Sequence, residues 1–212
     1  MHLRGFINLS FFLTVWLGSA VAIPAAIVCA YYGIYVPAYF IIAQISFRLI
    51  FPAKKWDWVR ETLCSEKTPY TKTCKIVLEK GATVPEPNSR VITSVAPHGI
   101  LTCGWSFVVG SDTFASADSK WLVAPAMMNL PFLGDLMRWT GCESADPKSM
   151  HKVMKTGANI GLIPGGFNEI SLFKRHHHRV FFKARKGFIK YALQYGYSVQ
   201  PAYCFGEELS YW

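Results

Sequence analysis

The stretch RVITSVAPHG, residues 90–99, decides the fold of this chain. Its first six residues, 90–95, are rich in β-branched side chains and predict a strand, which ends at the APHG turn. The stretch NIGLIPGGFNE, residues 159–169, has the same layout, because a predicted strand over 159–163 is closed by a Pro-Gly-Gly turn. Polar turns at strand ends are where parallel sheets bind ligands, so these two turns are the first places to look for chemistry.

Other strands and helices alternate along the second half of the chain. Further strands are predicted over 121–124, 180–182 and 198–205, the last of them broken at Pro201. Helices are predicted from Gly99 to Val109, from Asp146-Pro147 to Gly157, and over 186–195. This alternation predicts an α/β domain with a mixed or largely parallel sheet and flanking helices.

The N-terminal residues differ from the rest in charge. The chain of 212 residues has 22 Lys and Arg against 13 Asp and Glu, a net charge of +9, yet only 17% of its residues are charged and 51% are hydrophobic. A soluble domain has about 25% charged residues. No charged residue lies between Arg4 and Arg48. This composition excludes a disordered chain, a collagen-like chain and a small disulfide-rich scaffold.

The charge-free segment is long enough to cross a bilayer twice, at about 20 residues for each pass. It predicts a membrane hairpin in residues 1–50, helical over about 6–22 and 27–47 and interrupted near Pro24, followed by a second domain over 51–212. Basic residues on both flanks favour a cytosolic location for both ends. A signal peptide cleaved near Ala22 and followed by one span, or a buried core of a soluble protein, are the alternatives.

His98 and Glu169 are the candidate catalytic residues of the two turns. Histidine is the usual general base at neutral pH, and the position before Gly99 exposes the imidazole at the start of the predicted helix. Glu169, just past the glycine pair, can orient a histidine or a substrate hydroxyl. Gly165 and Gly166 allow a close backbone approach and can offer N–H groups to an anion. A structural histidine and a surface glutamate remain the alternatives.

Seven basic residues and no acidic residue lie between Lys174 and Lys190. Beside an apolar N-terminal segment, this run favours a membrane-associated anionic ligand, such as lipid headgroups or the phosphates of a coenzyme A type of carrier. Nucleic acid and a solvated basic face are the alternatives. The run His176-His177-His178 has no neighbouring carboxylate, so a metal site is not expected there.

Four blocks of the sequence resemble the type 2 diacylglycerol acyltransferase family, which includes monoacylglycerol and wax-ester acyltransferases. The turn at 96–99 resembles its His-Pro-His-Gly motif, although Ala96 stands where the family has the first histidine. Residues 163–170, 185–193 and 201–207 are similar to its glycine-pair-to-glutamate block, its Arg-Lys-Gly-Phe helix and its Pro-x-Tyr-x-Phe-Gly-Glu turn. The glycine block is most similar to the algal or protist branch. Because family members continue past that turn, the resemblance implies a C-terminally truncated domain over 51–212.

The resemblance implies a glycerolipid-acyltransferase-like fold and the transfer of a fatty acyl group from acyl-CoA to diacylglycerol. On that reading His98 is the general base and Glu169 holds it, with no covalent intermediate. Backbone N–H groups near Gly99, Gly165 and Gly166 are the candidate donors to the oxyanion. The phosphates of coenzyme A are expected at Arg179, Lys183, Arg185 and Lys186.

The resemblance also implies where the protein acts and what it binds. The expected partners are acyl-CoA, diacylglycerol and a phospholipid bilayer, and nucleic acid is not expected. The expected location is the endoplasmic reticulum membrane, with the catalytic domain in the cytosol, and lipid droplets. No metal or redox cofactor is expected, because a thioester is already activated. A monoacylglycerol or wax-alcohol acyltransferase and a non-catalytic paralogue that binds lipid or acyl-CoA are the alternatives.

Overall fold

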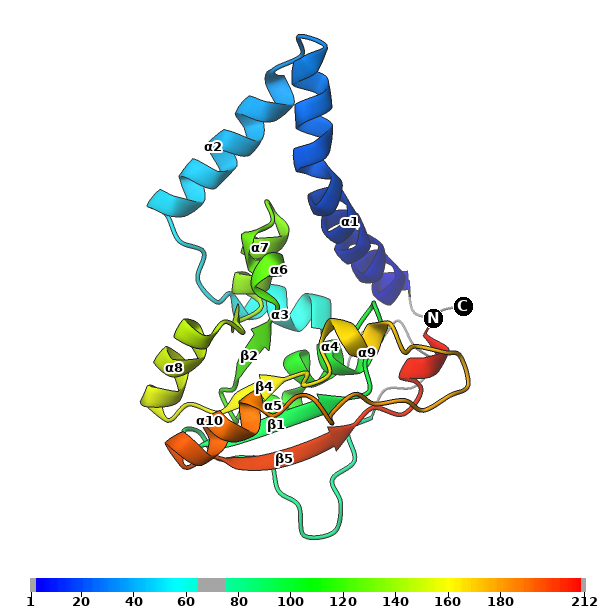
Figure 1. Cartoon of the computed structure of the whole chain (residues 1–212), viewed down its shortest axis with the longest axis vertical. Coiled ribbons are helices and arrows are strands. Elements are labelled where there is room, and N and C mark those ends of the chain that lie inside the picture. The colour runs from blue at the N-terminus through cyan, green and yellow to red at the C-terminus, as the bar shows by residue number, and fades with distance from the viewer. Residues whose placement is uncertain (1–2, 65–74, 211–212) are drawn as a thin grey trace.

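The computed structural model describes residues 3–64 and 75–210 of the chain (Figure 1). Its centre is a sheet of five strands, in the order β3-β2-β4-β1-β5, and every pairing between them is parallel. The strands are β1 (Val91–Ala96), β2 (Lys120–Val123), β3 (Cys142–Ser144), β4 (Ile160–Leu162) and β5 (Ser198–Tyr203). The predicted α/β class and parallel sheet are therefore confirmed.

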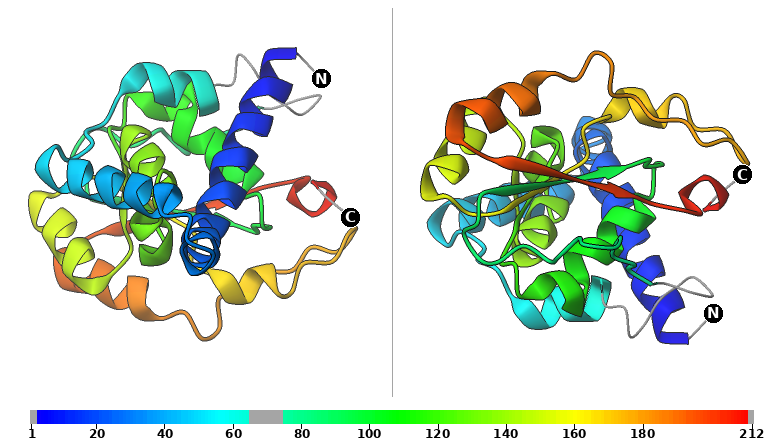
Figure 2. Two further views of the ribbon diagram at one scale, coloured as in Figure 1. Left: turned by 90° about the horizontal axis from the view of Figure 1, so that it is seen from above. Right: turned by 90° about the horizontal axis from the view of Figure 1, so that it is seen from below.

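Helices cover both faces of this sheet (Figure 2). Side chains alternate between the faces along each strand. On one face Ile92 and Leu122 pack with α8 (Pro147–Thr156) and α10 (Gly187–Tyr195). On the other face Val95 and Trp121 pack with helices that include α4 (Cys103–Gly110), α5 (Asp112–Ala115) and α7 (Leu133–Trp139). Burial on both faces explains why the inner strands β4 and β2 are apolar and buried over residues 160–162 and 121–123.

The helix predicted after Asp146 is confirmed at both ends. The Asp146 carboxylate accepts a hydrogen bond of 3.0 Å from the Ser149 N–H, which caps the start of α8. Gly157, with φ of +80°, ends the helix in a left-handed conformation that glycine adopts without strain.

Three sequence-based expectations for the second domain are wrong. Residues 180–182 form no strand, because β5 lies beside β1 at that edge of the sheet and the segment runs past it as irregular chain. Strand β5 continues through Pro201, which is tolerated because β5 is an edge strand. Helix α4 begins at Cys103 rather than Gly99, so an irregular turn follows His98.

The two N-terminal helices form a hairpin, but its turn is not where the sequence predicted it. The predicted break at Pro24 is wrong, because α1 runs from Leu3 to Tyr31 through that residue and α2 covers Val36–Ile50. The turn forms instead at Gly33, whose φ is +79°. The N–H groups of Gly33 and Ile34 donate to the carbonyls of Ala30 and Cys29 at 3.0 and 2.9 Å, which satisfies the end of α1.

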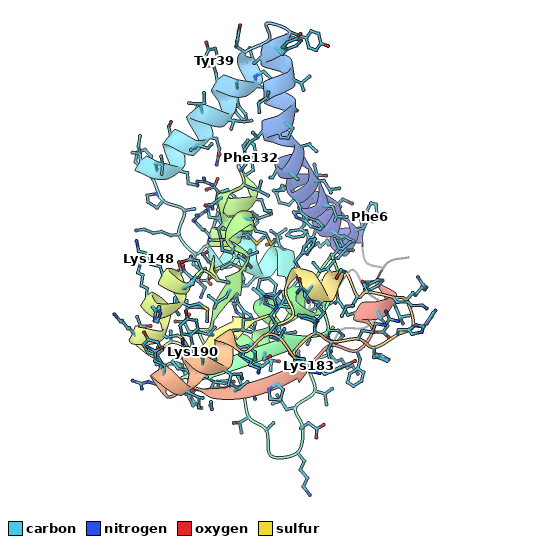
Figure 3. All side chains as sticks on the ribbon, viewed as in Figure 1. Phe6, Tyr39, Phe132, Lys148, Lys183 and Lys190 are labelled. Atoms are coloured by element: carbon cyan, nitrogen blue, oxygen red, sulfur yellow. The ribbon has the colours of Figure 1, made fainter. Side chains whose placement is uncertain are left out.

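The first half of α1 packs on the α/β domain, and the rest of the hairpin projects from it (Figure 1). Phe12, Val15 and Trp16 join the core that contains α4 and α7. The loop before α7 also reaches α2, where Phe132 stacks on Phe40 with ring centroids 5.7 Å apart; Figure 3 labels Phe132 between the hairpin and the rest of the molecule. Helix α1 has the length and apolar composition needed to cross a membrane. The remaining short helices are α3 (Asp57–Cys64), α6 (Pro125–Asn129), α9 (Phe167–Ile170) and the 3-10 helix η1 (Glu207–Leu209).

Candidate active site

Three adjacent strands bring polar residues to one edge of the sheet. His98 follows β1, Glu169 follows β4, and the pair Glu207-Glu208 follows β5. Because β1 lies between β4 and β5 and all three are parallel, their carboxyl ends meet at the same edge. Figure 1 shows α9 and the C-terminal turn together at the end of the sheet toward which β5 points. The strand order thus gathers residues that are more than 100 positions apart.

His98 and Glu169 form the closest polar contact of this edge. The distance between His98 Nδ1 and Glu169 Oε1 is 2.7 Å, and the backbone N–H of His98 donates to the same oxygen at 2.9 Å. The other carboxylate oxygen accepts a hydrogen bond of 2.8 Å from the Phe181 N–H. A neutral imidazole whose Nδ1–H donates to Glu169 keeps the lone pair of Nε2 as a proton acceptor. The predicted pairing of these two residues is confirmed.

Both side chains are buried, which the sequence did not indicate. Glu169 is 1% exposed and His98 is 5% exposed, so the expectation of an exposed imidazole is wrong. The reason is that the chain after α9 returns over the site, where Phe173, His177 and Arg179 line the pocket next to His98. Burial alone would raise the pKa of Glu169, but the hydrogen bonds from His98 and Phe181 hold that pKa below its ordinary value. The carboxylate is therefore charged at neutral pH.

The glycine pair shapes the turn that carries Glu169. A side chain at Gly165 would collide with the Glu169 carboxyl group, so only glycine lets the carboxylate fold back over the turn. Gly166 has φ of +53° and ψ of −154°, and it directly precedes α9. A close approach is present at Gly165 but not at Gly166, where a side chain would meet only the end of Arg185, and hydrogen bonds from these glycines to an oxyanion remain a prediction.

Glu207 holds the turn on the other side of His98. Its carboxylate is 2% exposed and accepts hydrogen bonds from the N–H groups of Gly99, Cys103 and Gly104 at 2.9, 3.2 and 2.8 Å. Thr102, at the start of α4, makes no side-chain capping bond. The Glu207 carboxylate, which lies about 100 residues later in the chain, caps this helix instead. The expectation that the Gly99 N–H serves an oxyanion is contradicted, because that group already donates to Glu207.

Glu208 is a second carboxylate that the sequence did not single out. It lines the pocket that contains His98 and Glu169 and is 9% exposed. Its Oε2 has no hydrogen-bond partner among the described residues, and His178 Nδ1 lies 3.7 Å from it. Glu207 ends the 201–207 block of the resemblance, and Glu207 and Glu208 are the only acidic residues after Glu169, but neither signal assigned a role to them. Their role depends on β5 lying next to β1, which local sequence does not reveal.

Of the four residues predicted to bind phosphate, the structure places two at the site and two outside it. Arg179 lines the pocket beside His98, and the half-buried Arg185 lies over the Phe181 ring, 5.7 Å from its centroid, close to Gly166. Lys183 and Lys186 are exposed and do not line that pocket. Figure 3 shows Lys183 at the opposite end of the molecule from Tyr39 in the helical hairpin. Two arginines are therefore brought to the site, and two lysines lie outside it.

Cys204 is a thiol close to the site. Its Sγ lies 3.7 Å from Glu207 Oε2. Burial, together with the neighbouring Glu207 carboxylate, raises the pKa of the Cys204 thiol well above its usual range. A protonated thiol is a weak nucleophile, so the arrangement favours chemistry based on His98 over a covalent intermediate on Cys204.

A second, larger pocket lies between the N-terminal helix and the α/β domain. Its walls come from α1, α3, α4, α6 and α7, and they are mostly apolar. Leu101 and Thr102, three and four residues after His98, also line it. The turn that Glu207 holds therefore contributes residues to both pockets.

The chain is similar in sequence to known acyltransferases. A family described as diacylglycerol acyltransferase matches residues 30–211 of the chain. The diacylglycerol O-acyltransferase 2 of Dictyostelium discoideum is 32% identical over 131 residues, which are 58% of this chain and 39% of that protein. The acyl-CoA wax alcohol acyltransferase 2 of Mus musculus is 32% identical over 130 residues, 57% of this chain and 39% of that protein.

A further relative covers more of the chain. The 2-acylglycerol O-acyltransferase 3 of Homo sapiens is 26% identical over 163 residues, 73% of this chain and 47% of that protein. The chain thus spans about two fifths to one half of the length of these curated relatives. No solved structure matches it.

Proposed function

This chain belongs to the diacylglycerol acyltransferase family, and we propose that it transfers a fatty acyl group from acyl-CoA to the free hydroxyl of diacylglycerol. The observation that carries this proposal is the buried His98–Glu169 pair, with 2.7 Å between Nδ1 and Oε1, in a pocket at the carboxyl ends of β1 and β4. A histidine oriented by a charged carboxylate is suited to general-base activation of an alcohol.

In the proposed reaction, His98 Nε2 takes the proton of the acceptor hydroxyl while its oxygen attacks the thioester carbonyl carbon. The tetrahedral intermediate then collapses, the carbon–sulfur bond breaks, and the imidazolium returns its proton to the coenzyme A thiolate. Glu169 stabilises the transient imidazolium, because its pKa is held low and it is charged throughout. No residue of the chain becomes acylated in this sequence of steps.

The oxyanion of that intermediate needs donors other than the Gly99 N–H, which donates to Glu207. The N–H groups of Gly165 and Gly166 are the proposed donors, because they lie in the turn that leads to Glu169. Arg179 and Arg185 are the proposed contacts for coenzyme A phosphates, since both lie beside this turn or the His98 pocket. Lys183 and Lys186 add positive charge along the approach to the site.

Membrane attachment is proposed to come from the N-terminal hairpin. Helix α1 is long and apolar enough to cross a bilayer, and apolar side chains on the projecting part are exposed, for example Ile27 and Leu49. Anchoring at the endoplasmic reticulum or on lipid droplets, with the α/β domain in the cytosol, would deliver a lipid acceptor to a site that also receives a soluble acyl carrier.

The acceptor is tested together with the activity. Membranes that carry the full chain are incubated with labelled oleoyl-CoA and, in parallel, with diacylglycerol, monoacylglycerol or a long-chain alcohol. Labelled triacylglycerol as the main product supports the proposal. A wax ester or diacylglycerol as the main product would reassign the acceptor, as the names of two relatives allow. Binding of oleoyl-CoA with no product from any acceptor would support a non-catalytic paralogue, for which Ala96 in the first motif is the motivation.

A further inference from the structure

The larger pocket has no role in the proton transfer proposed above. Leu9 and Phe12 of α1 face Trp105 and Val109 of α4 across it, and Met127 and Met137 complete much of the apolar wall. An apolar pocket in a protein holds a ligand of matching chemistry, usually with a small number of polar groups that fix its orientation. Methionine side chains also adapt their shape to a flexible apolar ligand.

One polar group in this wall lacks a partner. Trp105 is 7% exposed, and its indole N–H has no hydrogen-bond acceptor among the described residues. A buried donor without an acceptor costs free energy, and buried tryptophan N–H groups usually find a partner. A ligand that carries an uncharged acceptor would supply the missing partner. The carbonyl oxygen of an ester or thioester meets this description.

The position of the pocket points to the same ligand. Leu101 and Thr102 line its end near His98, and Val109 lies about 10 Å further along α4 at the rise of an α-helix. Leu9 and Phe12 of α1 also line the pocket, and α1 continues past the core-packed Trp16 toward the projecting part of the hairpin. The pocket therefore combines residues close in the chain to the proposed base with residues of the helix proposed to enter the membrane.

We infer that this pocket binds part of a long-chain fatty acyl group, whose carbonyl oxygen accepts a hydrogen bond from the Trp105 N–H. The inference rests on the proposed acyl transfer for the identity of the ligand, but binding does not require turnover. Acyl-CoA and diacylglycerol both carry such a group, and the experiment below distinguishes them.

Binding is measured on the purified full chain in detergent micelles, with one substrate at a time so that no transfer takes place. The first pair of probes is 1,2-dioleoylglycerol and its di-ether analogue, which lacks both carbonyl groups. The second pair is oleoyl-CoA and its S-alkyl thioether analogue, which lacks the thioester carbonyl. The variant Trp105→Phe keeps an aromatic ring but removes the N–H donor. Trp139→Phe, on α7 outside the pocket lining, is the matched control.

The expected result is a carbonyl preference that depends on Trp105. In one of the two pairs, the unaltered chain binds the carbonyl compound about three- to tenfold more tightly than its analogue, as one hydrogen bond predicts. Trp105→Phe abolishes this preference and leaves the affinity for the ether or thioether unchanged, whereas Trp139→Phe keeps it. The pair that responds identifies the source of the acyl group. The same preference in Trp105→Phe as in the unaltered chain, or no preference in either pair, would overturn the assigned hydrogen bond.

A second variant tests the pocket independently of the hydrogen bond. Val109→Phe fills the space and is expected to weaken binding of both members of the responding pair at least tenfold. Val199→Phe, at an exposed position of β5, is the control and should bind as the unaltered chain does. Equal affinities in Val109→Phe and Val199→Phe would place the acyl chain elsewhere. Because all these readouts are binding affinities, an inactive chain that passes them would refute only the proposed transfer.

Discussion

The turn around His98 follows β1 and the basic segment, residues 174–186, follows α9, and the two are held in opposite ways. The carboxylates of Glu169 and Glu207 fix the His98 turn, and both are almost fully buried. The basic segment contains no helix and no strand beyond the isolated bridge between Lys174 and His177, and most of its side chains are exposed.

This difference separates two tasks that the proposed acyl transfer requires. A general base works only when its ring is held in one orientation, which buried charge-assisted hydrogen bonds provide. Capture of a flexible, highly charged carrier needs positive charge near the entrance but no single geometry. Substitutions in the His98 turn should therefore change the rate or the stability, and those in the basic segment should change the affinity for acyl-CoA.

The largest effect is expected from His98→Ala. Loss of the base should lower the rate of acyl transfer by about a hundredfold to ten thousandfold, with little change in the KM for acyl-CoA. The rate is measured with labelled oleoyl-CoA in membranes that contain equal amounts of protein. His176→Ala, an exposed histidine of the basic segment, is the matched control and should keep its activity. A fully active His98→Ala variant would remove this residue from the mechanism.

The second effect is expected from Glu169→Gln, and it depends on pH. The folded-state pKa of Glu169 is lowered, so the charged carboxylate stabilises the fold above its unfolded pKa, and this contribution is lost as the pH falls through the folded pKa. The gap in thermal stability between the unaltered chain and the variant should therefore be widest near neutral pH and shrink in acid. A gap that is the same at all pH values would mean that the carboxylate charge does not contribute.

The third effect is expected from Glu207→Gln. An amide keeps one acceptor oxygen but places an NH₂ group against a backbone N–H, so at least one donor at the start of α4 loses its partner, at a cost of about 1–3 kcal/mol. A lower melting temperature and a lower kcat are expected, with the KM for acyl-CoA unchanged. Glu143→Gln, an exposed carboxylate on β3, serves as the control. Equal melting temperatures for the two variants would contradict the capping role.

The smallest effect is expected within the basic segment. Arg185→Ala should raise the KM for acyl-CoA several-fold and leave kcat nearly unchanged, because Arg185 lies next to the Gly166 turn. Lys183→Ala, at an exposed position outside the pocket, should have a weaker effect that disappears at high salt. A titration of acyl-CoA at two salt concentrations measures both. The comparison between the two regions fails if Arg185→Ala lowers kcat as strongly as His98→Ala.

Much of the fold could be predicted because its signals are local. The cap at Asp146, the β-branched run before Ala96 and the Pro-Gly-Gly turn each depend on neighbouring residues, and the structure has the corresponding elements at or near the expected positions. The expected break at Pro24 failed because an internal proline removes only one backbone hydrogen bond and need not end a helix, whereas Gly33 supplies the left-handed conformation that follows its end.

The sequence by itself determined the α/β class, the apolar N-terminal segment and the choice of His98 and Glu169 as candidate catalytic residues. The signals for these features are periodicity, charge and turn residues, and each depends only on residues that are close together in the chain. Only the tertiary structure placed β1 between β4 and β5 and so decided that Glu169 and Glu207 approach His98 from opposite sides. It also brought the Glu207 carboxylate to the start of α4, about 100 residues earlier in the chain, and placed Trp105 and residues of α1 in the lining of one pocket. These contacts follow from strand order and helix packing, which depend on the burial of the whole core rather than on any short stretch of sequence.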